Sequence, residues 1–285
     1  IVFGLTSLIF IKTFILGTEA NLVLIMGVLA TILLAGFLGF VDDVLGWKKG
    51  ISQLQKIILT LPIALPLVVI NVNRSIIDLP LFGVVNLGFI YPLLLVPVAV
   101  IGAANGFNLV AGYNGLEAGL GAIILSALGF VAYANGTNWL ALVCFIAVAA
   151  LIGFLCFNFC PARVFPGDSL TYPIGALIAV VAILGNMEKI ALFMFVLYFV
   201  DIMFYWGRAC VLNKMRKVEA FAKVNPDNSL ELPYSKWYDS THVALSVLKR
   251  FKKRVFERDI VVFMWFTQAL ICLFVLRFIW IGGWL

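Results

Sequence analysis

Charged residues are scarce in this sequence. Asp, Glu, Lys and Arg make up 12% of the 285 residues, hydrophobic residues make up 64%, and the mean hydropathy is +1.11. A soluble domain carries roughly 25% charged and 45–50% apolar residues. A single cleaved signal peptide does not explain the difference, because apolar runs recur along the whole chain. The sequence therefore predicts an integral membrane protein.

Histidine is nearly absent too, with one in the whole chain. The five cysteines consequently form no zinc-site pattern, and they lie in or beside apolar segments, at Cys144, Cys156, Cys160, Cys210 and Cys272. No Walker motif, protein-kinase signature or His-Glu-x-x-His motif is present. The net charge of +6 is read as a signal of topology and of anionic lipids or substrates, and no nucleic-acid partner is expected.

The sequence is rich in long apolar runs. A membrane-spanning helix needs about 20 mainly apolar residues. Nine stretches approach that length, near 1–16, 21–40, 57–73, 87–105, 117–135, 138–157, 169–186, 189–207 and 259–282. We expect an all-α, polytopic bundle of about nine transmembrane helices, forming one integral membrane domain over residues 1–285. Because the first residue is Ile and already lies in an apolar run, we expect the natural chain to begin upstream.

The distribution of basic residues orients this bundle. If the nine segments alternate, residues 41–56, 106–116, 158–168 and the long basic loop 208–258 share one face with the start of the chain. Sixteen of the twenty Lys and Arg residues fall in these loops, and Arg74, Lys189 and Arg277 fall toward the other face. Cytosolic loops carry the excess of Lys and Arg. The polar loops are therefore predicted to be cytosolic.

Those loops carry a restricted set of side chains. They hold carboxylates, amides, glycines and cations, and the candidate site residues among them are Asp42, Asp43, Lys56, Asn105, Asn108, Asn114, Glu117, Arg163, Phe165 and Asp168. Carboxylate and amide oxygens suit Mg²⁺, Lys and Arg suit phosphates, and glycines allow the backbone to approach a phosphate closely. The pattern favours phosphoryl chemistry at a membrane surface.

Each motif also has a purely structural interpretation. Asp42 and Asp43 could end one helix and cap the next, or pair with nearby lysines. The Gly167-Asp168-Ser169 sequence is a common helix N-cap. Asn105 and Asn108 have the spacing of residues that hydrogen-bond between helices. All of these coinciding on one predicted face is less expected than a shared functional site.

Taken together, the loops resemble those of the polyprenyl-phosphate N-acetylhexosamine-1-phosphate transferases, most closely their eukaryotic and archaeal branch. The resemblance rests on GFVDDVLGW at 39–47, NGFNLVAGYNGLEAG at 105–119, FNFCPARVFPGDS at 157–169 and LELPYSK at 230–236. It covers essentially the whole chain in order. The family fold has ten transmembrane helices and a cytosolic active site, and the nine segments here would match helices two to ten. A nucleotide-binding segment would precede residue 1.

The resemblance implies roles for individual residues. Asp168 and Asn108 match Mg²⁺ ligands, with Mn²⁺ as an alternative ion. Asp42 and Asp43 match the paired catalytic aspartates, and Lys56 matches a lysine that contacts pyrophosphate. Phe165 matches the aromatic ring that stacks on uracil, and Asn114 a residue that recognises it. Asn105, Glu117 and Arg163 belong to the same motifs and are candidate substrate-binding residues, although Glu117 could equally hold its loop.

The implied reaction transfers N-acetylglucosamine-1-phosphate from UDP-GlcNAc to dolichyl or polyprenyl phosphate and releases UMP, which starts lipid-linked oligosaccharide assembly for protein N-glycosylation. The implied partners are the UDP-sugar, the lipid phosphate, membrane lipids and a second copy in a homodimer. The membrane would be the plasma membrane of an archaeon or the endoplasmic reticulum of a eukaryote. Another UDP-N-acetylamino sugar, or a transporter or lipid-binding protein without chemistry, are the alternatives.

Three features depart from the family pattern or add to it. The His-containing motif of the last cytosolic loop is replaced by KMRKVEAFAKVNPD at 214–227, and His242 is expected to be an ordinary loop residue. Residues 243–258 predict a basic amphipathic helix on the membrane surface, with Val243, Val247, Phe251 and Val255 on one stripe. Asp201 lies within an apolar helix, where it could line a lipid-phosphate groove or pair with a polar neighbour.

Overall fold

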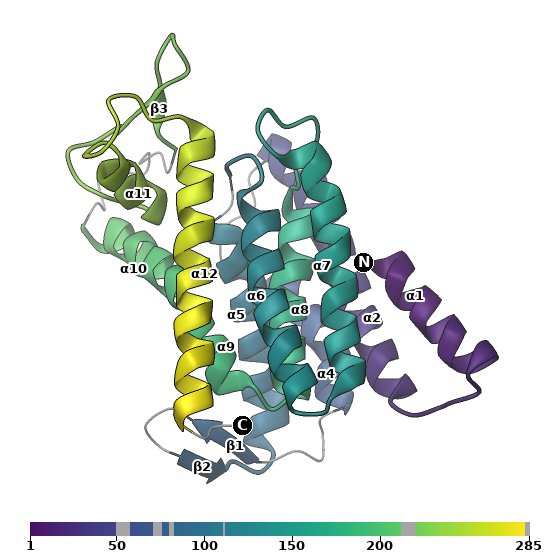
Figure 1. The fold of residues 1–285 in the computed structure, drawn as a ribbon. Helices are drawn as coiled ribbons and strands as arrows, with labels where there is room; N and C mark the ends of the chain where they lie inside the picture. Colours follow the sequence, from purple (N-terminus) through teal and green to yellow (C-terminus); the bar gives the residue numbers. More distant parts are fainter. Residues whose placement is uncertain (50–57, 71–75, 80–82, 111, 212–220, 283–285) are drawn as a thin grey trace.

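The computed structural model describes residues 1–49, 58–70, 76–79, 83–110, 112–211 and 221–282. It is a bundle of helices with two short antiparallel hairpins (Figure 1). The elements before the centre of the chain are α1 (Val2–Phe10), η1 (Ile11–Ile15), α2 (Leu22–Lys49), η2 (Leu61–Ala64), α4 (Leu65–Ile70), β1 (Ile76–Leu79), β2 (Gly83–Asn86), η3 (Tyr91–Leu95) and α5 (Val96–Leu109).

The remaining elements complete the bundle, and a long helix comes last. They are α6 (Leu116–Ala134), α7 (Asn138–Asn158), α8 (Asp168–Leu184), α9 (Glu188–Met194), α10 (Val196–Val211), β3 (Lys223–Val224), β4 (Leu230–Glu231), α11 (Ser240–Leu248) and α12 (Glu257–Gly282). The helical and membrane character predicted from the apolar runs is confirmed, and the two hairpins are additions that the runs did not predict.

Each of the nine predicted spans overlaps a helix. Five described helices are at least 18 residues long and apolar enough to cross a membrane, namely Leu22–Leu45, Tyr91–Leu109, Leu116–Ala134, Asn138–Asn158 and Glu257–Ile279. Three further apolar helices are shorter, Val2–Ile15, Ile58–Ile70 and Asp168–Leu184. The predicted span 189–207 is divided at Phe195 into α9 and α10. The number of crossings therefore stays a prediction.

Helix α8 is the centre of the bundle. Every residue from Thr171 to Ile183 is buried, and α8 packs against both α2 and α5. A helix that is apolar on all sides is buried, either inside a protein or in a membrane. Its contact with α5 is close, because a Cβ added at Gly175 would lie 2.4 Å from the carbonyl oxygen of Ala103. Small residues of this kind let transmembrane helices pack backbone to backbone.

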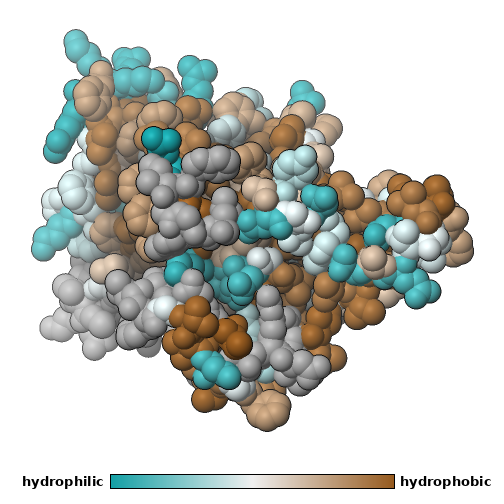
Figure 2. Space-filling view, turned by 60° about the horizontal axis from the view of Figure 1, so that its bottom comes forward, coloured by the Kyte–Doolittle hydropathy of each residue, from teal (hydrophilic) through white to brown (hydrophobic). Residues whose placement is uncertain are grey.

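The two ends of the bundle differ. At one end, which we call the loop end, lie residues 112–115, residues 159–167 and α11; at the other, the hairpin end, lie β1–β2 and the turns at 135–137 and 185–187 (Figure 1). The β1–β2 register pairs Ile76 with Asn86 and Leu79 with Gly83. Figure 2 turns the hairpin end forward and shows hydrophilic residues along the upper left edge and in patches across the middle, beside wide hydrophobic areas. The alternation predicted from the sequence places the same loops together.

The structure contradicts the prediction of a basic amphipathic helix over residues 243–258. Helix α11 ends at Leu248, and Phe251 is 84% exposed whereas Val255 is fully buried. The chain leaves the helix because other contacts hold it: Leu230 N donates to the carbonyl oxygen of Val255 at 2.8 Å, and Phe256 N donates to Asp259 Oδ2 at 2.9 Å. His242 is not a loop residue either, since it lies buried on α11.

Candidate active site

The first turn of α8 is capped by a side chain from another helix. Asp168 is the first residue of α8, and Gly167 before it has no side chain to cap the exposed amides. Asp43 of α2 supplies the cap: its Oδ1 accepts from Asp168 N at 2.8 Å, and its Oδ2 accepts from Ser169 N at 3.0 Å and Ser169 Oγ at 2.6 Å. A carboxylate there satisfies free amides and is attracted by the positive end of the helix dipole.

Two glycines make this contact sterically possible. A Cβ added at Gly39 would lie 2.2 Å from the carbonyl oxygen of Asp168, so α2 touches the backbone of α8 directly. Gly167 has φ +60°, and a Cβ there would lie 2.6 Å from Asp43 Oδ2. Any larger residue at either position would push Asp43 away from the amides that it caps.

Asp42, the neighbour of Asp43, has a different environment. It is 2% exposed, and its Oδ2 accepts a hydrogen bond from the hydroxyl of Tyr172 at 2.8 Å. Tyr172 lies one turn after Asp168 on α8. The two adjacent aspartates therefore both contact α8, one at its exposed first turn and one deeper in the bundle.

Asn108 reaches the same helix from α5. Its Oδ1 accepts a hydrogen bond from Thr171 Oγ1 at 2.9 Å. On a helix, residues at i, i+3 and i+4 share a face, which is the spacing of Asp168, Thr171 and Tyr172. This face of α8 brings together groups from α2 and α5 that are more than sixty residues apart in the sequence.

The donor set at this face fits a hard cation. Carboxylate oxygens of Asp42 and Asp168 and the amide oxygen of Asn108 are the ligand types that Mg²⁺ and Mn²⁺ accept. Within the described residues no group of three or more His, Cys, Asp or Glu side chains is arranged as a metal site. The candidate ligands at this face are two aspartates and one asparagine, so they do not make up a group of three such side chains. Lys56, the predicted pyrophosphate contact, lies outside the described residues.

A second polar group holds the loop residues 112–115. Glu117, which is 2% exposed, accepts from Gly112 N through Oε1 at 2.7 Å. Asn114 donates to Glu257 of α12 twice, from its backbone N at 2.7 Å and from Nδ2 at 3.2 Å. Of the two interpretations of Glu117, these contacts favour the one in which it holds the loop. Glu257 in turn fixes the orientation of the Asn114 side chain.

Asn105 has an interhelical contact. Its Nδ2 donates to Thr60 Oγ1 at 3.1 Å and to the carbonyl oxygen of Ile101 at 2.9 Å. Thr60 is fully buried in the helix that covers residues 58–70. The side chain thus ties α5 to its neighbour, as its structural interpretation predicted, and none of its hydrogen bonds goes to the aspartates.

Arg163 and Phe165 lie on the loop 159–167 with their side chains exposed, Phe165 to 57%. The backbone beneath them is held, because Arg163 N donates to the carbonyl oxygen of Phe157 at 2.7 Å. Asn158 Nδ2 donates to the carbonyl oxygen of Val164 at 2.9 Å. A fixed loop with an exposed aromatic ring and a guanidinium could stack on a base and neutralise a phosphate.

Two groups near these loops have altered acidity. Cys160 donates to Glu257 Oε2 at 3.9 Å, and its burial, reinforced by that carboxylate, raises the pKa of the thiol. Burial also raises the pKa of Tyr113, whose hydroxyl accepts from Ala222 N at 3.1 Å. Both groups therefore keep their protons at neutral pH, and neither supplies an anionic nucleophile.

Several contacting residues were missed by sequence reasoning. Thr171 and Tyr172 could have been found, because in DSLTY they follow Asp168 by three and four residues, spacings that share one helix face, whereas Ser169 directly follows Asp168 and does not share that face. Glu257 could not, because it lies 143 residues after Asn114 and the sequence shows only an acidic residue at the start of the last apolar run.

An apolar groove runs beside this face. It has a volume of about 360 Å³ and is lined by residues of α5, α8, α9 and α10. At the hairpin end it reaches Tyr91, whose hydroxyl donates to Glu188 Oε1 at 2.6 Å. Toward the loop end it reaches Gly106, two residues before Asn108 on α5. The polar face and the groove are therefore neighbours along one helix.

Known proteins share this sequence pattern. Residues 25–186 match the model of the family described as glycosyl transferase family 4. The chain is 32% identical over 257 residues to a protein of Sulfolobus acidocaldarius named provisionally as a UDP-N-acetylglucosamine–dolichyl-phosphate N-acetylglucosaminephosphotransferase, covering 89% of this chain and 73% of that one. A Saccharolobus solfataricus protein of the same name is 32% identical over 86% of this chain and 72% of its own length. A phospho-N-acetylmuramoyl-pentapeptide-transferase of Streptococcus equi is 36% identical over 69% of this chain and 60% of its own.

Proposed function

This chain belongs to glycosyl transferase family 4, and we propose that it transfers N-acetylglucosamine-1-phosphate from UDP-GlcNAc to dolichyl or polyprenyl phosphate, releasing UMP. The two archaeal relatives carry the name of this activity and cover most of the chain. The product would be the first intermediate of a lipid-linked oligosaccharide. GlcNAc is favoured over other N-acetylamino sugars on the strength of these two relatives.

The observation that carries the proposal is the convergence on α8. Three side chains contact α8 toward the loop end. Asp42 contacts Tyr172, Asp43 contacts the first turn, and Asn108 contacts Thr171. Oxygen ligands gathered this way suit a cation and a pyrophosphate. A transporter has no need of such a set beside a lipid-sized groove.

The groove between α5, α8, α9 and α10 suits the polyprenyl tail. It is apolar, whereas its nearest polar neighbours toward the loop end are those of the Asn108 region. A lipid lying there would carry its phosphate toward Asn108 and Asp168. This arrangement keeps the tail in an apolar environment while the reacting phosphate stays at the polar face.

Asp168 and Asn108 would hold Mg²⁺, or Mn²⁺ in its place, with Asp42 next to them. When bound, the ion neutralises phosphate charge and stabilises the leaving oxygens. In the reaction, an oxygen of the lipid phosphate forms a bond to the sugar-linked phosphorus. The bond from that phosphorus to the bridging oxygen breaks, and the electron pair leaves with UMP.

The aspartates act by position in this proposal. A phosphate monoester has a second pKa near 6, so the acceptor is mostly ionised at neutral pH and needs little help from a base. Asp43 already uses both carboxylate oxygens to cap α8. Its role would be to hold Asp168 in place, and Asp42, oriented by Tyr172, would face the cation. Lys56 would contact the pyrophosphate.

The uridine would bind above the loop 159–167. Phe165 is exposed and could stack on the base, and Arg163 could pair with a phosphate. Asn114, oriented by Glu257, would recognise the base edge, and Glu117 would support the loop that carries it. Asn105 would contribute indirectly, through the packing of α5.

The same proposal covers topology and assembly. The single membrane domain would cross the bilayer nine times in this chain with the loop end in the cytosol, because the loops that the sequence predicts on that side contain most of the Lys and Arg. The membrane would be the plasma membrane in an archaeon or the endoplasmic reticulum in a eukaryote. A homodimer is part of the proposal by family analogy.

The test is UMP release by the purified protein in detergent with polyprenyl phosphate, UDP-GlcNAc and Mg²⁺. We expect Asp168→Asn and EDTA each to reduce turnover by at least about a hundredfold, because the ion supplies several kcal/mol of charge stabilisation. Glu19→Gln is the matched control, since Glu19 is exposed at the hairpin end, and it should keep full turnover. No UMP with any UDP-sugar would contradict the proposed function.

A further inference from the structure

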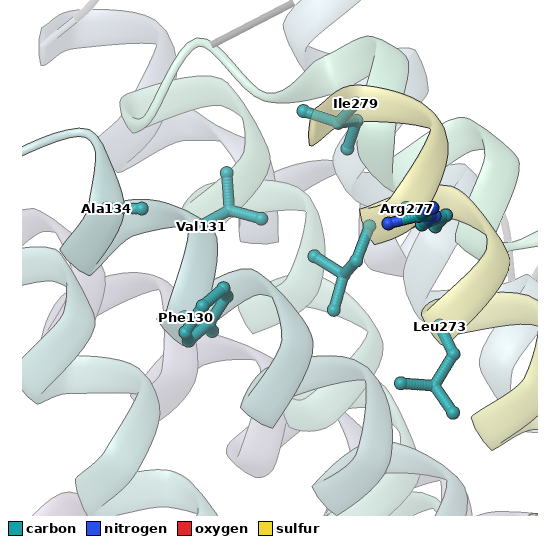
Figure 3. A pocket seen from close by; sticks show the side chains of 7 residues that line it. Phe130, Val131, Ala134, Leu273, Arg277 and Ile279 are labelled. Carbon is teal, nitrogen blue, oxygen red and sulfur yellow. The ribbon is translucent and has the colours of Figure 1, made fainter. Parts of the chain in front are cut away.

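A second apolar groove lies on the outside of the bundle, where α6 and α12 meet. One hollow of about 510 Å³ is lined by Phe130, Val131, Ala134, Leu273, Leu276, Arg277 and Ile279. A second of about 440 Å³ continues it toward α7 and shares Phe130, Leu273 and Leu276. Figure 3 shows the first hollow with side chains of both helices around it. It is separate from the groove beside the proposed active site.

Arg277 is the charged member of this lining. It lies 20 residues after Glu257, the first residue of α12, and a helix rises about 1.5 Å per residue. The distance along α12 is thus about 30 Å, the thickness of the hydrocarbon core of a bilayer. Since Glu257 contacts the loop end through Asn114, Arg277 lies at the level of the opposite headgroups.

Two features describe the position of this cation. A long Arg side chain near the end of a transmembrane helix extends to the headgroups, and Arg277 is exposed on the outer face of the bundle. It is also one of few Lys and Arg residues toward the hairpin end. Among the residues that the structure describes, no carboxylate forms an ion pair with it. An anion from outside the chain would satisfy it.

We propose that this groove binds a phospholipid with an anionic headgroup, drawn from the leaflet at the hairpin end. An acyl chain lies along the apolar surface between α6 and α12, and the guanidinium of Arg277 donates to the lipid phosphate. The geometry fits both parts, because the apolar lining extends from Arg277 toward the middle of α12 through Leu273 and Ala269. Arg is well suited to a phosphate, since its planar group donates two parallel hydrogen bonds.

A second copy of the chain is a less suitable occupant. Packing a second apolar helix over the groove would bury Arg277 without a partner, and an unpaired buried charge is costly. A phospholipid avoids that cost, because its chain covers the apolar surface while its phosphate stays at the polar interface beside the guanidinium.

Native mass spectrometry of the intact protein can test this, with phosphatidylglycerol and phosphatidylcholine added in turn. We expect the protein to bind phosphatidylglycerol roughly tenfold more tightly, and Arg277→Gln to remove that preference. Arg277→Lys should keep part of it. Leu273→Trp, which fills the hollow, should weaken both lipids alike. The matched control Lys12→Gln removes a cation from the projecting N-terminal segment and should change nothing.

Two outcomes would overturn the proposal. In one, the wild-type protein shows no preference for phosphatidylglycerol, or Arg277→Gln keeps it. In the other, the protein is a dimer that Arg277→Gln converts to monomer with no change in bound lipid. UMP release serves as a check that each variant is folded, and because Arg277 lies far from the loop end, a failure here leaves the proposed catalytic function untouched.

Discussion

Adjacent residues on a helix point about 100° apart, and the two aspartates of α2 show what that separation does. Asp43 is exposed and holds the first amides of α8, whereas Asp42 is buried and accepts from the hydroxyl of Tyr172. Two chemically identical neighbours thus have different partners: Asp43 accepts from two backbone amides and a serine hydroxyl, and Asp42 accepts from a tyrosine hydroxyl. The division of labour between them follows from the direction of each Cα–Cβ bond.

At the residue scale we predict that Asp43 acts through α8. Asp43→Asn should lower the free energy of unfolding by about 1 kcal/mol, because the carboxylate cap and its charge at the helix dipole are both weakened. Turnover should fall with it, since Asp168 shifts. Ser169→Ala removes one of the three hydrogen bonds and should show a smaller effect of the same kind. Thermal unfolding and UMP release measure the two quantities.

Glu231→Gln is the control for this pair, because Glu231 is exposed on β4 and should leave both quantities unchanged. A different result would assign Asp43 to the chemistry itself. In that case Asp43→Asn would abolish turnover without any change in unfolding temperature, and Ser169→Ala would change neither turnover nor unfolding temperature.

At the element scale, α8 organises the candidate site because a glycine stands at its points of contact with α2 and α5. Gly39 lets α2 reach the first turn of α8, and Gly175 lets α8 reach α5. A carboxylate that accepts two hydrogen bonds joins α10 to α11. Asp201 accepts from Ser240 N and Ser240 Oγ, both at 2.7 Å. These contacts favour the structural interpretation of Asp201, pairing with a polar neighbour.

Two glycines on α2 give a matched test of helix contact. A Cβ at Gly39 would lie 2.2 Å from the carbonyl oxygen of Asp168, whereas one at Gly36 would lie 3.6 Å from Pro173 Cγ, an ordinary contact. Gly39→Ala should therefore destabilise the protein by roughly 1–3 kcal/mol and reduce turnover. Gly36→Ala should be neutral or stabilise by up to about 1 kcal/mol, because Ala favours a helix.

Denaturant or thermal unfolding in one detergent compares the two variants, and UMP release reports on the position of Asp168. If both variants behaved alike, α2 and α8 would not be in direct backbone contact, and the orientation of Asp43 would need another cause.

At the scale of the whole molecule, polarity is segregated between the two ends. Residues 112–115, 159–167 and α11 lie at the loop end, and β1–β2 lies at the other (Figure 1). Sixteen of the twenty Lys and Arg residues fall in the loops that the sequence predicts on that side. This segregation is what a protein with one catalytic membrane face requires, and it matches the side that positively charged loops normally occupy.

The predicted orientation can be measured by labelling single cysteines in a cysteine-free background. Glu19→Cys lies at the hairpin end and should react with a membrane-impermeant maleimide applied to the outside of intact cells. Glu231→Cys lies at the loop end and should react only after the membrane is permeabilised. Both native residues are exposed, so accessibility of the side chain does not differ between them. The reverse pattern would place the loop end outside the cytosol.

Composition and periodicity were sufficient for the membrane character, the order of helices and the loops that meet at one end. These follow from the sequence because burial of apolar surface in lipid depends on runs of residues, and each run is local. The same reasoning failed at 243–258, where an apolar stripe suggested a long helix. Val255 is buried against neighbours far along the chain and Phe251 is exposed, so the stripe does not lie on one face.

The sequence alone also determined which residue types could do chemistry: hard oxygen ligands, cations and an exposed aromatic ring in four separate motifs. Only the tertiary structure decided their partners. Asp42 and Asp43 have different partners on α8, and Glu117 accepts a hydrogen bond from its own loop. Glu257 contacts Asn114, which lies 143 residues earlier in the sequence. The physical reason is that the sequence gives the chemical type of each side chain directly. The hydrogen-bond partner of a side chain depends instead on which helices pack together and on how closely their glycines let them approach.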